Sequence, residues 1–168
     1  AVRLLHHSLS PPAGAWPPTV FDHYGVDLNR NFDFHWGTRG VQWEPRSQTY
    51  PGPSAASEPE TQAVQNLLSS VFSGQVEAWD AGAASDNADG VFVSLHQHGE
   101  LVLWPWWDTT SPTPDGLGLE AIGRKFASYN GYTAGPGAGT LYDASGPADD
   151  WPYRPLQAPS CTTEMGQE

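Results

Sequence analysis

The chain has 168 residues, enough for one domain that buries roughly two thirds of the surface its unfolded form exposes. Acidic residues outnumber basic residues 19 to 7, and the formal charge of -12 at pH 7 argues against nucleic acid or an anionic membrane surface as a partner. One cysteine, Cys161, excludes an internal disulfide, and no apolar run is long enough to span a bilayer.

The first informative segment is 25–36, which reads Gly-Val-Asp-Leu-Asn-Arg-Asn-Phe-Asp-Phe-His-Trp. Apolar Val26 and Leu28 predict a strand that ends at Asn29 and Arg30. The Asn29 amide and the planar guanidinium of Arg30 offer N–H donors that match the two oxygens of a carboxylate. Taken alone, however, the pair is better explained by a structural salt bridge with a turn.

The first predicted helix starts at Ser57. The run Ser57-Glu58-Pro59-Glu60 offers a capping hydroxyl, a proline in the first turn and a glutamate three residues after the cap. Gly74 is predicted to end this helix. The apolar residues at helical spacing between them are Val64, Leu67, Leu68, Val71 and Phe72.

Sixteen prolines and eighteen glycines indicate a loop-rich protein. The Ala/Gly/Asp-rich stretch 80–90 is predicted to be a long surface loop. Its candidate calcium ligands are Asp86, Asn87 and Asp89. We favour a solvated loop over a calcium site, because the acidic residue that closes such a site is missing.

Two strands and a second helix follow. Short runs of β-branched and aromatic residues predict strands at 90–96 and 101–104, the second closed by Pro105. A helix is predicted from about 117 to 130, with Gly131 as its stop. Its inward residues are predicted to be Leu119, Ile122 and Phe126. The alternation predicts an α/β fold, with a mixed, largely parallel sheet and helices on both faces.

Segment 25–36 resembles the one with which zinc metallocarboxypeptidases, the carboxypeptidase A/B-like family, hold the C-terminal carboxylate of a substrate. Four further segments resemble parts of that family in the same order along the chain. They are 50–53 with 57–61, then 95–106, 141–153 and 162–166. Five ordered matches favour carboxylate binding over the salt-bridge interpretation. They imply that residues 1–168 form a single, partial carboxypeptidase-like domain.

The resemblance assigns chemistry to individual residues. Asn29, Arg30 and Tyr142 would bind the carboxylate of the substrate, and the glycine-rich run 131–139 would give Tyr142 freedom to move. His96 would be one ligand of a single catalytic zinc ion.

Glu164 would be the general base, presented rigidly by a strand that Thr162 and Thr163 favour. Without the family context, a glutamate so close to the end of the chain would be interpreted as exposed. His98 is interpreted as a pocket-wall or structural residue and not as a zinc ligand.

The pocket for the last side chain of the substrate would be lined by Ala144, Asp149 and Thr162. Asp149 implies a preference for Lys or Arg, because a carboxylate at the base of a pocket pairs with a cation. The alternative is an ordinary solvated acidic turn that also contains Asp143 and Asp150.

The chain departs from the family pattern in its zinc ligands. Two ligands come in the family from a His-x-x-Glu motif upstream of the carboxylate-binding segment, and residues 1–24 do not contain it. His6 stands at the position of the arginine that polarises the scissile carbonyl. We therefore expect the other two ligands upstream of this chain, which would be the C-terminal part of its domain, without the last helix.

These features imply a zinc-dependent carboxypeptidase that acts on the C-termini of peptides, in the secretory pathway or outside the cell. The main alternative is a catalytically degenerate module that binds C-termini without hydrolysis. A third is a carbohydrate-binding domain, motivated by eight tryptophans, of which Trp104, Trp106 and Trp107 are neighbours.

Overall fold

A computed structural model describes residues 7–8, 25–72, 84, 88 and 90–166. The loop residues Asp86, Asn87 and Asp89, which we interpret as solvated, lie outside this part of the chain, as do His6 and Gly74. Within it, no helix combines the length and the apolar character needed to cross a membrane.

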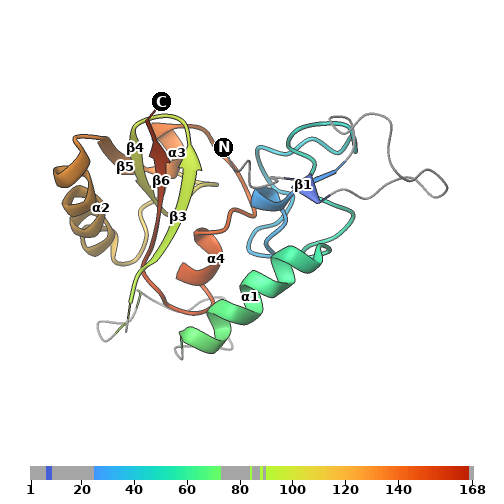
Figure 1. Cartoon of the computed structure of the whole chain (residues 1–168), viewed down its shortest axis with the longest axis horizontal. Coiled ribbons are helices and arrows are strands. Elements are labelled where there is room, and N and C mark those ends of the chain that lie inside the picture. The colour runs from blue at the N-terminus through green and yellow to red at the C-terminus, as the bar shows by residue number, and fades with distance from the viewer. Residues whose placement is uncertain (1–6, 9–24, 73–83, 85–87, 89, 167–168) are drawn as a thin grey trace.

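A four-stranded mixed sheet is the centre of the fold, in the order β3-β6-β4-β5 (Figure 1). Its strands are β3 (Phe92–Gln97), β4 (Leu101–Trp104), β5 (Thr133–Pro136) and β6 (Ser160–Met165). The pairs β3–β6 and β4–β5 are parallel, whereas β4 and β6 are antiparallel. The predicted mixed, largely parallel sheet is therefore confirmed, and the strand predicted at 101–104 has those bounds.

Helices lie on both sides of this sheet (Figure 1). The helix α2 (Gly116–Asn130) lies on one side, and α1 (Pro59–Val71) and the short α4 (Asp150–Tyr153) lie on the other. A second, two-stranded antiparallel sheet joins β1 (His7–Ser8) to β2 (Val26–Asp27). The short helices η1 (Leu28–Arg30) and α3 (Gly137–Thr140) complete the described elements.

The start of α1 differs from the sequence prediction. Glu58, and not Ser57, is the N-cap, and its side chain makes no capping hydrogen bond. The Ser57 hydroxyl instead accepts from the Asn31 amide at 3.0 Å and donates to Glu58 at 2.8 Å. The buried Asn31 side chain thus binds the hydroxyl that the local sequence predicts as the helix cap. Pro59 does occupy the first turn, as predicted.

The C-terminal end of α2 is confirmed, because Gly131 adopts the left-handed conformation with φ 76°. The prediction for Phe126 is wrong, since its side chain is 38% exposed. The buried residues of α2 are instead Leu119 and Gly123, four positions apart, and Gly123 lies directly against Trp104 of β4.

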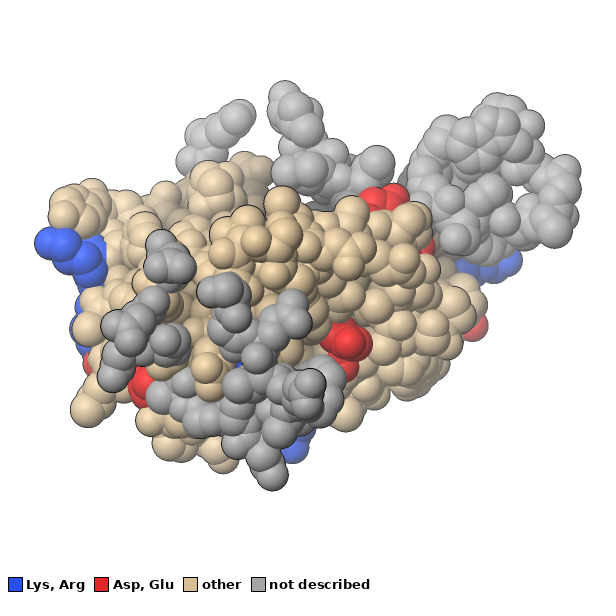
Figure 2. Space-filling view, turned by 90° about the horizontal axis from the view of Figure 1, so that it is seen from below, with Lys and Arg blue, Asp and Glu red and all other residues tan. Residues whose placement is uncertain are grey.

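The main core is rich in aromatic residues from several loops. Its buried rings include Phe32, Phe34, Trp106, Trp151 and Tyr153. Trp104, Trp106 and Trp107 are all buried, so the group that motivated the carbohydrate-binding alternative is part of the packed interior. Acidic and basic residues are scattered over the face shown in Figure 2, where charge gathers in no single patch.

The close packing of α2 on β4 can be tested with two glycines of this helix, one in contact with the sheet and one that serves as the control. A Cβ atom at Gly123 would lie 2.4 Å from the Trp104 ring, whereas one at Gly118 in the same helix meets nothing within 4 Å. We expect Gly123→Ala to lower the free energy of unfolding by about 1–3 kcal/mol through overpacking. Gly118→Ala should raise it by up to about 1 kcal/mol through helix propensity. Urea denaturation of both variants measures the contrast, and equal effects would contradict it.

Candidate active site

The register of β3 on β6 places the predicted zinc ligand beside the predicted base. His96 is the direct neighbour of Glu164 on the parallel strand, so both side chains leave the same face of the sheet. Both residues also lie near the carboxyl ends of their strands, the edge at which ligands bind in such sheets. Residues 68 positions apart in sequence thus share one location.

Glu164 is 8% exposed, which contradicts the reading of this residue as a solvated terminal glutamate. Burial raises the pKa of Glu164, and the negative charge of Asp149 acts in the same direction. Gly99 approaches it closely, since a Cβ atom there would lie 3.2 Å from the Glu164 Cβ. A buried carboxylate with a raised pKa has the properties of a general base or acid.

His96 is half-buried, and its Nε2 lies 2.9 Å from the Ser94 hydroxyl. An imidazole at the end of a strand fits one position of a catalytic zinc site. The described residues contain no group of three His, Cys, Asp or Glu side chains that could hold a metal ion. His96 is therefore suited to be one ligand, and the described residues place no second and third ligand beside it.

The predicted carboxylate-binding residues come together from distant segments. Arg30 is 5% exposed, and its Nη2 donates to the Tyr142 hydroxyl at 3.3 Å. The guanidinium carbon also lies 5.5 Å from the centre of the Tyr142 ring. Nη1 donates to the Asn29 carbonyl at 2.8 Å, and the Asn29 side-chain oxygen accepts from the Ala148 N–H at 2.9 Å.

The salt bridge considered from sequence is also present, but it is long. Arg30 Nη1 lies 4.0 Å from Asp27 Oδ2, while Asp27 Oδ1 accepts from the Asn29 N–H at 3.0 Å. Asp27 is thus the N-cap of η1, which holds Asn29 and Arg30 in place. The structural and the substrate-binding interpretations of this segment are compatible.

The predicted specificity residues are neighbours around Trp107. Asp149 Oδ2 accepts from the Trp107 indole N–H at 2.7 Å and from the Thr162 hydroxyl at 3.0 Å. Ala144 packs against the Trp107 ring, and its N–H donates to the Trp107 carbonyl at 2.8 Å. Asp149 is 1% exposed, so the residues packed over it close its carboxylate off from solvent.

The solvated acidic turn considered from sequence is not found at Asp149 and Asp150, which are each 1% exposed. Burial raises the pKa of Asp149 from 3.8 to about 6, although hydrogen bonds from Trp107 and Thr162 lower it. Burial and the charge of Asp149 raise the pKa of Asp150 well above its usual value, against a hydrogen bond from the Trp107 N–H.

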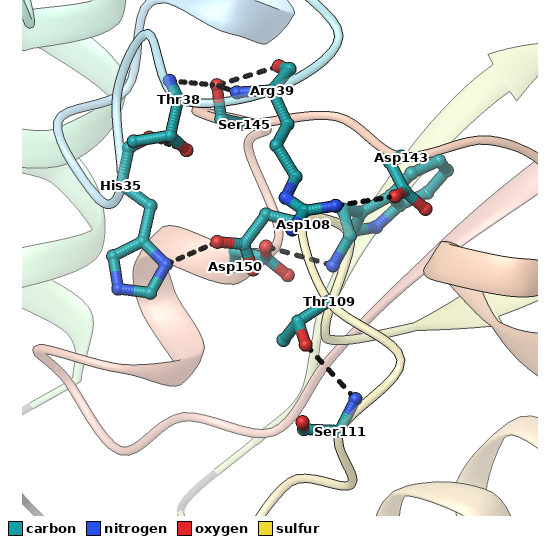
Figure 3. A network of polar contacts seen from close by, with 10 residues as sticks. His35, Thr38, Arg39, Asp108, Thr109, Ser111, Asp143, Ser145 and Asp150 are labelled. Carbon is teal, nitrogen blue, oxygen red and sulfur yellow. Dashed lines mark hydrogen bonds and ion pairs between the residues drawn. The ribbon is translucent and has the colours of Figure 1, made fainter.

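A further polar network, which the sequence did not indicate, links three loops (Figure 3). His35 Nδ1 lies 2.5 Å from Asp108 Oδ2, and Arg39 pairs with Asp143 at 3.1 Å. The Ser145 hydroxyl accepts from the Arg39 N–H at 3.2 Å and donates to its carbonyl at 2.9 Å. The loop that carries Tyr142 is thereby fastened to the one that follows Arg30.

Two cavities lie near these loops. One of about 460 Å³ is lined by Asn29, His96, Ser94 and mainly apolar neighbours from η1, α1 and β3. It joins a predicted carboxylate-binding residue to the predicted zinc ligand. A larger one of about 590 Å³ is lined by Phe34, His35 and Trp106 among others, and by none of the predicted site residues.

Trp107 is the residue that sequence analysis missed. It touches two segments that carry predicted specificity residues, yet the sequence treats it only as one of three neighbouring tryptophans. Its position three residues after the predicted strand 101–104 was the available signal, because residues beyond the carboxyl ends of strands line sites in α/β folds.

Comparison with known proteins identifies the class. Residues 4–168 match the zinc carboxypeptidase family. Carboxypeptidase B of Bos taurus is 34% identical over 135 residues, which cover 77% of this chain and 29% of that protein. Zinc carboxypeptidase of Simulium vittatum is 33% identical over 145 residues, covering 83% of this chain and 43% of its own length.

Solved structures of similar fold support the same family. Carboxypeptidase A from Helicoverpa armigera superposes with a TM-score of 0.72 at 26% identity, covering 87% of this chain and 34% of that one. Thrombin activatable fibrinolysis inhibitor also gives 0.72, at 28% identity, covering 94% and 36%. The chain belongs to the zinc carboxypeptidase family. It spans about 29% of the length of the carboxypeptidase B it matches.

The buried carboxyl of Asp149 predicts how stability depends on pH. Because its folded pKa of about 6 exceeds the usual 3.8, ionisation of this group opposes folding, so its contribution to stability is largest below about pH 4 and is lost as pH rises through about 6. The loss from this group should be roughly 3 kcal/mol. Asp149→Asn should flatten this part of the curve, while Asp150 retains a slope of the same sign. Urea denaturation of the wild type and of Asp149→Asn from pH 4 to 7 measures the free energy of unfolding. The same slope against pH in both proteins would show that Asp149 does not cause the pH dependence.

Proposed function

We propose that the full-length protein is a zinc-dependent carboxypeptidase that hydrolyses the last peptide bond of peptides with a free C-terminus. The observation that carries this proposal is the pairing of His96 with Glu164 on adjacent parallel strands, in a chain where Arg30 contacts Tyr142. A metal ligand, a proton acceptor and a cation for a carboxylate are the three functions that the reaction requires.

Each residue has one task in this proposal. Arg30 and Tyr142 bind the two oxygens of the terminal carboxylate, and Asn29 adds an amide donor. His96 is one ligand of zinc, whose chemistry in such a site is the activation of a water molecule. Glu164 accepts a proton from the attacking water at its carboxylate and delivers it to the leaving amine. The other zinc ligands come from outside the described residues.

The preference among substrates is proposed to favour Lys or Arg at the C-terminus. Its support is Asp149, a carboxylate in contact with Thr162 and close to Ala144 through Trp107. At pH values above about 6 this group is mostly ionised, and an anion buried beside a substrate pocket attracts a cationic side chain. The family resemblance further supports a location in the secretory pathway or outside the cell.

A second candidate is a module that binds C-termini without hydrolysis. It is favoured by a specific contrast among the described residues, which include all three proposed carboxylate-binding residues but only one proposed zinc ligand, His96. The two candidates differ in whether the full-length protein supplies the remaining zinc ligands.

Metal content separates these candidates. We expect the 168-residue chain to bind zinc weakly and to lack activity, because one imidazole does not make a site. The full-length protein should retain one equivalent of zinc after dialysis, as measured by elemental analysis. His96→Ala should remove that zinc from the full-length protein. Retention of a full equivalent by the isolated chain would contradict the assignment, and a metal-free full-length protein would favour the non-catalytic module.

Substitutions separate binding from chemistry. In the full-length enzyme, Arg30→Ala should mainly raise KM for peptides with a free C-terminus, with some loss of kcat from a misplaced scissile bond. Glu164→Gln should abolish turnover and leave peptide affinity close to that of the wild type, because the amide keeps the shape but cannot accept the proton. Steady-state rates and calorimetry measure both effects, with C-terminally amidated peptides as the control substrate.

Near-normal turnover in Glu164→Gln would show that this residue is not the base. Unchanged affinity for the free and the amidated peptide in Arg30→Ala would show that the guanidinium does not bind the carboxylate.

A further inference from the structure

Trp107 lies at the meeting point of the segments that carry the proposed specificity residues. Its indole N–H donates to Asp149 Oδ2 at 2.7 Å, and its backbone N–H donates to Asp150 Oδ2 at 3.1 Å. Its ring centre is 5.9 Å from that of Tyr142. The side chain is 3% exposed, so its position is fixed by packing on every side.

The Trp107 ring packs directly against Gly137. A Cβ atom at Gly137 would lie 2.5 Å from Trp107 Cδ2, so any larger residue there would displace the indole. Leu103 and Ala144 belong to the same buried cluster. The glycine at this turn therefore allows a bulky aromatic ring to reach the Asp149 carboxylate.

The indole N–H occupies a position on Asp149 that a substrate cation would need. Asp149 Oδ2 already accepts from Trp107 and from Thr162, and the residue is 1% exposed. A Lys or Arg side chain can pair with this carboxylate only by displacing or sharing these donors. Hydrogen bonds to ionised groups are the strong ones, so the competition has a measurable cost.

We propose that Trp107 is a specificity-determining residue, which competes through its indole N–H with the cationic side chain of a substrate for the Asp149 carboxylate. This inference rests on the proposed carboxypeptidase function and deepens it. The Asp149 carboxylate attracts a C-terminal Lys or Arg, and the hydrogen bond from Trp107 determines how strong the preference for these residues is. Uncharged C-terminal side chains do not need the carboxylate and meet no such competition.

The test compares substrates in the full-length enzyme carrying Trp107→Phe, which removes the N–H donor and keeps an aromatic ring. At about pH 8, where Asp149 is ionised in the wild type, kcat/KM is measured for matched peptides ending in Arg and in Leu. We expect the Arg-to-Leu ratio to rise by about tenfold, the factor for one hydrogen bond to a charged group. Asp149→Asn added to Trp107→Phe should abolish that gain.

Trp151→Phe is the matched control. Trp151 is also a buried tryptophan, but its indole N–H has no hydrogen-bond partner in the described structure. The substitution should disturb packing to a similar degree and leave the Arg-to-Leu ratio unchanged. An equal rise in both variants would assign the effect to loosened packing and overturn the proposal.

A second measurement needs no change at Trp107. In the full-length Glu164→Gln variant, which should bind peptides without cleaving them, the NMR signal of the Trp107 indole proton is followed during titration. A peptide ending in Arg should shift this signal and speed its exchange with water, and a peptide ending in Leu should not. Binding of the Arg peptide without any change at the Trp107 proton would overturn the proposal.

The pKa of Asp149 gives a readout that is independent of hydrolysis. Because the Trp107 hydrogen bond lowers this pKa, Trp107→Phe should raise it above about 6 in carboxyl NMR titrations. Failure of the wild type to hydrolyse any peptide would contradict the proposed function. Hydrolysis with an Arg-to-Leu ratio that Trp107→Phe leaves unchanged would instead contradict only the role of Trp107.

Discussion

The strand β6 has neighbours on both sides, and this double pairing fixes the positions of the proposed zinc ligand and the proposed base. Parallel contact with β3 sets His96 beside Glu164, and antiparallel contact with β4 sets Leu101 on the other side of the same glutamate. A shift of one residue in either register would turn Glu164 to the opposite face of the sheet. The strand therefore presents the proposed base at a fixed position, with a carboxylate kept in a buried environment on a rigid element.

Burial of Asp149 and Asp150 is the main electrostatic cost of this arrangement. Burial raises the pKa of both carboxyls, the charge of Asp149 raises that of Asp150 further, and the ionisation of both groups opposes folding near neutral pH. Trp107 offsets part of this cost with one N–H donor for each carboxylate. The same two bonds join the segment after β4 to the segment at the start of α4, so one residue contacts both buried acids through its backbone and its side chain.

Local pattern was sufficient for the elements whose signals agree with one another. The strand at 101–104 and the end of α2 at Gly131 follow from residues within the element, since β-branched runs and a left-handed glycine depend on few distant contacts. The start of α1 and the exposure of Phe126 could not be predicted. The Asn31 amide binds the Ser57 hydroxyl, which therefore does not cap α1. The close contact of Gly123 with Trp104 sets which side of α2 packs on the sheet. Both depend on residues distant in the sequence.

For the site, the sequence by itself determined the identity of the groups: a guanidinium and an amide in adjacent positions, an imidazole at a strand end, and a glutamate after two threonines. Their order along the chain identified the family. Only the tertiary structure decided that Arg30 meets Tyr142, that His96 faces Glu164, and that Asp149 lies under Trp107. The physical reason is that the function of a charged or polar group depends on its partners and on its exclusion from water. Both are set by strand register and packing between segments that are distant in the chain.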